Sequence, residues 1–69
     1  MEIKINGELQ EIEDAKLTIN RLLSLRKIEA PEMVSVQLNG KIIDRNRYGS
    51  TAILENDEVE FLYFMGGGA

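Results

Sequence analysis

The sequence predicts an α+β domain in which a mixed β-sheet of four to five strands carries one main helix on one face. Asn-Gly occurs twice, each time between segments that alternate polar and apolar residues, which is typical of β-hairpins. The stretch between these hairpins carries apolar residues at helical spacing, and the most aromatic strand-like segment comes near the end of the chain. We therefore expect two hairpins, a helix and a final strand around one small core.

The first element is a hairpin with its turn at Asn6-Gly7. A two-residue turn of type I′ needs positive φ at both central positions, which Asn and Gly adopt most readily. This turn places Lys4 opposite Leu9 and sets the register of the pair. Ile3 and Ile5 then share the core face, and Leu9 lies on the other face.

The second element is an amphipathic helix over residues 18–26. Thr18 is a suitable N-cap, because its hydroxyl can accept a hydrogen bond from a free backbone N–H. Ile19, Leu22 and Leu23 recur at helical spacing and form the apolar face. We expect this face to pack on the apolar alternate positions of the sheet: Ile3, Ile5, Val36, Ile43, Val59 and Phe61.

A second hairpin follows, with its turn at Asn39-Gly40. Residues 44–50 are polar and irregular, with Tyr48 as an anchor in the core. Ile53 and Leu54 are expected to make one more apolar contact before a turn at residues 55–57.

The final strand, residues 59–64, is apolar on both sides. Because a single helix covers only one face of a sheet, Leu62 and Phe64 are expected on the exposed face. With Met65 and Leu9 they would form a docking patch for a partner protein. Scattered surface residues without a function are the alternative.

Composition excludes several classes of function. The chain of 69 residues has no Cys and no His, which excludes disulfides, Cys/His zinc sites and Ser-His-Asp catalysis. A net charge of −4 argues against nucleic acid as a partner. No apolar run is long enough to span a membrane. We expect a cytoplasmic domain that binds neither nucleic acid nor membrane, and no metal.

The chain divides into a folded domain, residues 1–65, and a flexible glycine tail, residues 66–69. Gly66, Gly67 and Gly68 carry no side chain, so an extended tail can be threaded into a site where a Cβ would collide. A disordered terminus and a cloning scar are the alternative interpretations.

Several of these stretches together resemble the ThiS family of ubiquitin-like sulfur carriers used in thiamine biosynthesis: residues 3–8, 18–26, 34–40, 57–60 and 64–68. The resemblance implies a β-grasp fold and a carrier that is not an enzyme and binds no cofactor. It also implies that an E1-like adenylating enzyme (ThiF/MoeB type) uses ATP and a sulfur donor to convert the Gly68 carboxylate to a thiocarboxylate. A thiazole synthase (ThiG type) would then accept the sulfur.

The resemblance leaves other acceptors open. The small subunits of molybdopterin synthase (MoaD family) have a similar fold, so the sulfur could serve molybdopterin, tungstopterin, a thiolated tRNA or an amino acid. A ubiquitin-like modifier of lysines and an interaction module without tail chemistry are further alternatives. Because the reactive group in the family is the carboxylate of the last glycine, Ala69 is expected to be removed by a C-terminal trimming protease.

Two positions depart from the pattern of the family. Lys27 stands at the end of the helix where many ThiS-like sequences have glycine, and Asn56 stands where a glycine commonly precedes the aspartate. Asn readily adopts the left-handed conformation, and the loop can rearrange. We expect the loops to accommodate both substitutions.

Overall fold

The structure is a computed structural model that describes residues 1–63. The expectations for Phe64, Met65 and residues 66–69, and the domain boundary at residue 65, lie outside the described residues. Within residues 1–63 the elements are, in chain order, β1 (Glu2–Ile5), β2 (Glu8–Glu11), β3 (Leu17–Thr18), α1 (Ile19–Leu25), the 3₁₀ helix η1 (Pro31–Met33), β4 (Val34–Leu38), β5 (Lys41–Ile42), the 3₁₀ helix η2 (Arg45–Arg47), β6 (Ala52–Ile53) and β7 (Glu58–Tyr63).

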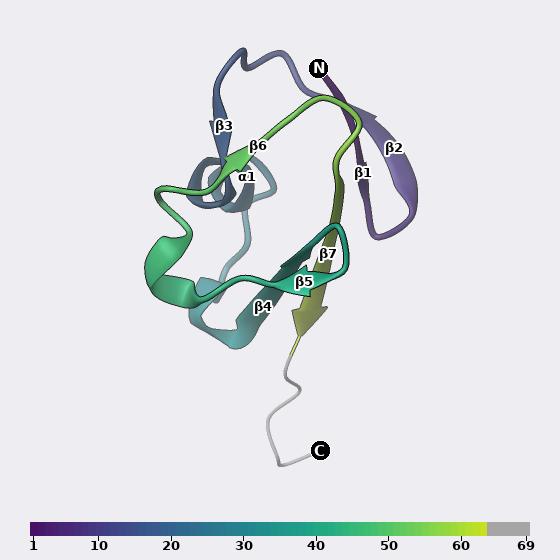
Figure 1. Ribbon diagram of the computed structural model, residues 1–69. Coiled ribbons are helices and arrows are strands. Elements are labelled where there is room, and N and C mark those ends of the chain that lie inside the picture. Colours follow the sequence, from purple (N-terminus) through teal and green to yellow (C-terminus); the bar gives the residue numbers. More distant parts are fainter. Residues whose placement is uncertain (64–69) are drawn as a thin grey trace.

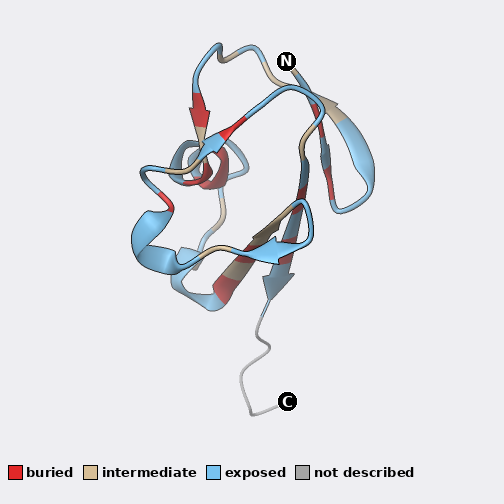
Figure 2. Ribbon diagram, viewed as in Figure 1, coloured by how far each residue is buried: buried red, intermediate tan, exposed pale blue. Residues whose placement is uncertain are grey.

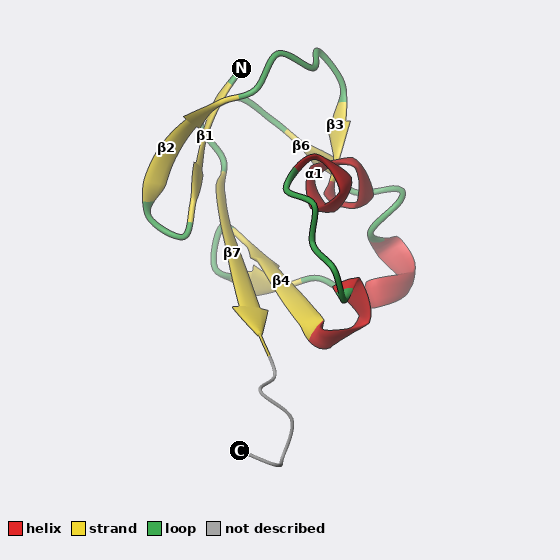
Figure 3. Cartoon of the chain, turned by 180° about the vertical axis from the view of Figure 1, so that it is seen from behind, coloured by secondary structure: helices red, strands yellow, loops and turns green. Residues whose placement is uncertain are grey.

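The larger sheet of the described residues has the strand order β2-β1-β7-β4-β5 (Figure 1). β1 and β7 are parallel, and the other neighbours are antiparallel. The first and last strands therefore lie side by side at the centre of the sheet. Helix α1 covers one face of this sheet (Figure 3), which confirms the predicted α+β architecture.

Both predicted hairpin turns are present. Asn6 and Gly7 have φ values of 51° and 86°, and Asn39 and Gly40 have values of 51° and 84°. Positive φ at both central residues is the requirement of a type I′ turn. The registers follow, with Lys4 opposite Leu9 in the first hairpin.

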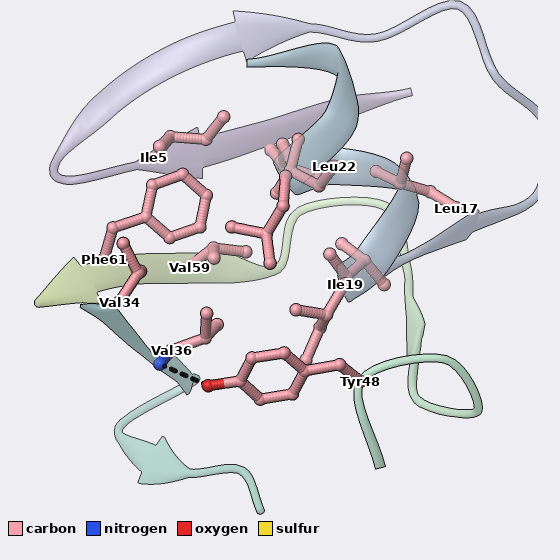
Figure 4. Close-up of a cluster of buried hydrophobic side chains, with 12 residues drawn as sticks. Ile5, Leu17, Ile19, Leu22, Val34, Val36, Tyr48, Val59 and Phe61 are labelled. Atoms are coloured by element: carbon pink, nitrogen blue, oxygen red, sulfur yellow. Dashed lines mark hydrogen bonds between the residues drawn. The ribbon is translucent and has the colours of Figure 1, made fainter. Parts of the chain in front are cut away.

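The core lies between α1 and the covered face of the sheet (Figure 2). The N-cap is Thr18, whose Oγ1 accepts a hydrogen bond from the Arg21 N–H at 3.2 Å. Leu22 is fully buried among the sheet residues (Figure 4). The predicted packing surface is confirmed, with Ile43 at the margin of the core rather than inside it.

Tyr48 anchors the irregular segment that the sequence places after the second hairpin. Its ring is buried, and its hydroxyl accepts a hydrogen bond from the Val36 N–H at 3.0 Å (Figure 4). The guanidinium carbon of Arg45 lies 5.7 Å from the centre of the same ring. Arg45 also donates hydrogen bonds to the Pro31 and Val34 carbonyls. The anchor prediction is confirmed, and the Tyr48 hydroxyl satisfies a buried backbone donor of β4.

Two features differ from the sequence prediction. Leu17 pairs with Ile53, so β3 and β6 form a second, two-stranded sheet. No alternating pattern in the sequence predicts these two strands. Ile53 is buried as expected, but Leu54 is 63% exposed, so the expectation that Leu54 contacts the core is wrong. Successive side chains of an extended segment point to opposite sides, so Leu54 faces away from the core that Ile53 enters.

Helix α1 ends in a Schellman motif. The Lys27 N–H donates to the Ser24 carbonyl at 3.0 Å, and the Ile28 N–H donates to the Leu23 carbonyl at 3.2 Å. Lys27 has a φ of 54°, which lies in the left-handed region that disfavours residues with a Cβ. The motif therefore forms although Lys27 replaces the usual glycine.

Lys27→Gly is expected to raise the free energy of unfolding by about 0.5–1 kcal/mol, because glycine relieves the strain of the left-handed backbone. Urea unfolding of the two proteins measures the difference. Lys27→Ala is the control, since it removes the charge but keeps the Cβ, and it should give no stabilisation. A less stable Lys27→Gly variant would show that the lysine side chain adds more to the free energy of unfolding than the strained backbone subtracts from it.

Candidate functional site

The candidate site is the end of β7, the strand from which the glycine-rich segment of the sequence continues. β7 is the middle strand of the larger sheet, and its last described residue is Tyr63. It runs away from the N-terminus toward the lower edge of the view (Figure 1). The predicted site residues Phe64, Met65, Gly66, Gly67 and Gly68 lie outside the described residues. The structure therefore describes the surfaces that flank the point where they begin.

Leu62 lies on the face of the sheet that α1 does not cover. It is 41% exposed and pairs with Ser35 of β4. The next residue of β7 on the same face is Glu60, which is also exposed. Leu62 is thus an isolated apolar side chain on a polar surface, one residue before the last described position.

Leu9 lies on the same face as Leu62 but at a distance from it. Leu9 is 62% exposed and pairs with Lys4, which in turn pairs with Glu58 of β7. Glu58 is four residues from Leu62, which is about 13 Å along a strand. Because the parallel register fixes this offset, the structure does not bring Leu9 beside Leu62.

At the end of β7, the face opposite Leu62 borders a hollow that the sequence does not predict. The hollow has a volume of about 450 Å³. It is lined by Arg26, Lys27, Ile28, Glu29, Ala30, Met33 and Tyr63. Tyr63 follows the core positions of β7 in alternation yet is 54% exposed, and the end of β7 is exposed in Figure 2.

The hollow lies between the segment that follows α1 and the end of β7. The helix spans seven residues and ends at Leu25, and residues 26–30 and Met33 line the hollow together with Tyr63. Met33, at 39% exposed, and Tyr63 remain accessible. Lys27 has a positive φ, and the chain turns at this residue. In the sequence the only sign of this turn is that Lys27 departs from the ThiS-like pattern.

The residues described around the end of β7 are mostly apolar, aromatic or basic. Among residues 1–63, no group of three or more acidic, His or Cys side chains is arranged to hold a metal ion. No helix in that part of the chain is long and apolar enough to cross a membrane. Apolar, aromatic and basic side chains around the end of β7 suit the docking of another protein.

A mixed sheet with parallel first and last strands and a helix on one face defines the chain as a ubiquitin-like, β-grasp domain. The family can also be named. Residues 3–68 match the ThiS family, and the chain belongs to this family.

Solved structures agree with this assignment. The crystal structure of the thiamine biosynthesis protein ThiS from Geobacter metallireducens is 40% identical in sequence, with a TM-score of 0.88 over 99% of this chain and 100% of that chain. The solution structure of a thiamine biosynthesis protein from the same organism, also 40% identical, gives a TM-score of 0.81 over 100% of this chain and 90% of that chain.

Curated relatives are larger proteins. A thiazole synthase from Magnetococcus marinus is 35% identical over 68 residues, which are 99% of this chain and 20% of that protein. A thiazole synthase from Paramagnetospirillum magneticum is 30% identical over 69 residues, which are 100% of this chain and 21% of that protein. The chain thus spans about a fifth of the length of these relatives.

Proposed function

We propose that the chain is a sulfur carrier whose Gly68 carboxylate is adenylated and then converted to a thiocarboxylate. The observation that carries the proposal is the match to the ThiS family, which extends through Gly68 itself. Two further facts support it. β7 ends at Tyr63, five residues before Gly68 in the sequence, and glycines leave room for a backbone to enter a narrow active site.

The proposed chemistry activates the carboxyl group of Gly68 and then replaces one of its oxygen atoms with sulfur, in two steps. A carboxylate oxygen of Gly68 attacks the α-phosphorus of ATP, and pyrophosphate leaves as the acyl adenylate forms. Hydrosulfide then attacks the carbonyl carbon, AMP leaves, and a thiocarboxylate and a proton are released. Because the chain has no His and no Cys, an E1-like adenylating enzyme would supply the catalytic groups, and the chain would act as its substrate.

We propose a thiazole synthase as the sulfur acceptor. Two curated relatives that contain a segment similar to this chain are themselves thiazole synthases, and the similar segment forms only about a fifth of each. A carrier-like domain and a synthase in one chain hold the reacting groups at a high effective concentration. A separate carrier would need a docking surface to achieve the same encounter.

The end of β7 is the proposed docking surface. Leu62 on one face and Tyr63 with Met33 on the other flank the start of the tail, and all three are accessible. Phe64 and Met65 follow directly in the sequence and are proposed to join them. Apolar and aromatic residues at this place would fix the direction in which the tail enters the partner.

Leu62→Ser is expected to raise the Kd for the adenylating enzyme about 10-fold, because the loss of a central apolar contact costs about 1.4 kcal/mol. Titration calorimetry with each variant measures the Kd. Leu54→Ser is the matched control, since Leu54 is 63% exposed and precedes the turn that leads into the other end of β7. Equal Kd values for the wild type and Leu62→Ser would contradict the docking role.

The acceptor is tested with a carrier that already bears the thiocarboxylate, prepared by sulfide cleavage of an intein fusion that ends at Gly68. Labelled sulfur in this form is expected to enter the thiazole when a thiazole synthase and its substrates are added. Sulfur that stays on the carrier with an active synthase would contradict thiazole synthase as the acceptor. A molybdopterin-forming system serves as the comparison acceptor.

A further inference from the structure

The two turn asparagines do more than form their turns, because both hold β7. The Asn6 N–H donates to the Val59 carbonyl at 2.9 Å, and the Asn6 Oδ1 accepts a hydrogen bond from the Phe61 N–H at 2.9 Å. β1 itself ends at Ile5, where the parallel pairing with Val59 is the last. The Asn6 side chain thus continues the β1 edge of the ladder by one more hydrogen bond.

Asn39 holds the opposite end of β7 from the opposite edge. Its N–H donates to the Glu58 carbonyl at 2.7 Å, and its Oδ1 accepts from the Glu58 N–H at 2.9 Å. Its Nδ2 also donates to the Asp57 Oδ1 at 3.1 Å. The two asparagines are therefore chemically matched, but Asn39 acts where β7 begins and Asn6 acts three residues further on, toward the tail.

The position of Asn6 affects the direction of whatever follows β7. Beyond Phe61, β4 pairs with one edge of β7 as far as Tyr63, whereas the chain of the first hairpin turns away at Gly7. Among the described residues, the Asn6 hydrogen bond is thus the last hydrogen bond to β7 on its β1 edge. Gly68 follows Phe61 by only seven residues, which span at most about 25 Å.

We propose that Asn6 is a positioning residue for the reaction at Gly68. Its Oδ1 holds the Phe61 N–H and so fixes the angle at which β7 directs the tail into the active site of the adenylating enzyme. The inference rests on the proposed function and adds a residue to it. A displacement of about 1 Å at a reacting group can cost up to about 100-fold in rate.

Three variants separate positioning from stability. Asn6→Gly and Asn39→Gly both keep a residue that accepts positive φ, so both turns remain, and both lose side-chain hydrogen bonds to β7. Asn6→Asp restores an oxygen that can accept from the Phe61 N–H. Circular dichroism confirms that each variant is folded.

ATP-pyrophosphate exchange by the adenylating enzyme, measured against carrier concentration for forms ending at Gly68, gives kcat and KM. Asn6→Gly is expected to lower kcat about 10-fold with KM unchanged, because the docking surface is intact and the reacting carboxylate is misplaced. Asn39→Gly is expected to match the wild type, and Asn6→Asp to recover most of kcat. Equal kcat for Asn6→Gly and the wild type, or an equal loss in Asn39→Gly, would overturn the proposal.

Amide hydrogen exchange of the carrier alone separates this inference from the proposed function. In Asn6→Gly the Phe61 amide is expected to exchange about 10-fold faster than in the wild type or in Asn39→Gly. An unchanged exchange rate of the Phe61 amide would overturn the positioning role of Asn6, whichever partner the carrier binds. A wild-type carrier that supports no exchange of pyrophosphate would instead overturn the proposed function, with the Phe61 result still deciding whether Asn6 holds the strand.

Discussion

Leu22→Ala is expected to unfold a large part of the protein population under conditions in which the wild type is folded. Leu22 is fully buried between α1 and the sheet, and truncation of such a leucine costs about 2–5 kcal/mol. A domain of 69 residues has only a few kcal/mol of stability to lose. Urea unfolding followed by circular dichroism measures the loss.

Leu25→Ala is the matched control for this prediction. Leu25 belongs to the same helix and undergoes the same chemical change, but it is 37% exposed. Its truncation is expected to cost less than about 1 kcal/mol, because little apolar area leaves the core. An unfolding midpoint that Leu22→Ala leaves unchanged would mean that the helix does not pack on the sheet through this face.

A carrier that ends at Ala69 is expected to be adenylated at least about 100-fold more slowly than one that ends at Gly68. The additional residue moves the carboxylate past the reacting position and places a methyl group beside it. ATP-pyrophosphate exchange with equal concentrations of the two forms measures the ratio. Both forms share residues 1–68, so the docking surface is the same in each.

The opposite result is equally informative. If the form that ends at Ala69 exchanges pyrophosphate as fast as the shorter form, no trimming protease is needed. The reactive carboxylate would then belong to Ala69, and the proposed site would move one residue outward.

Local chemistry explains how much of the fold was predictable. The turn at Asn6-Gly7 fixes the register of its hairpin by backbone φ alone, and that register assigns Ile3 and Ile5 to the core. The same reasoning holds for Asn39-Gly40. Thr18 and the spacing of Leu22 likewise mark the helix by its cap and its apolar face.

Long-range arrangement explains what was missed. Leu17 and Ile53 pair across 36 positions through strands of two residues, too short to show an alternating pattern. Tyr63 follows the core positions of β7 in alternation yet is 54% exposed, and Met33, which lines the hollow with it, lies 30 positions earlier in the sequence. The second role of Asn6 also depends on a contact with a residue 55 positions away.

The covalent part of the candidate site stays a prediction. The glycines at residues 66–68 are evident in the sequence, and the ThiS-like pattern implies that the chemistry takes place at Gly68. The surfaces that flank the tail required the structure. Leu62 was expected to be exposed and is, whereas Leu9 lies about 13 Å further along the sheet and the hollow beside Met33 was not foreseen.

The most direct test of the central claim is the intact mass of the carrier ending at Gly68 after incubation with ATP, an E1-like adenylating enzyme and sulfide. We expect the mass to rise by the difference between one sulfur and one oxygen atom, and fragmentation to place the change at Gly68. An unchanged mass, with an enzyme preparation that converts its own carrier protein under the same conditions, would contradict the account of this chain as a sulfur carrier.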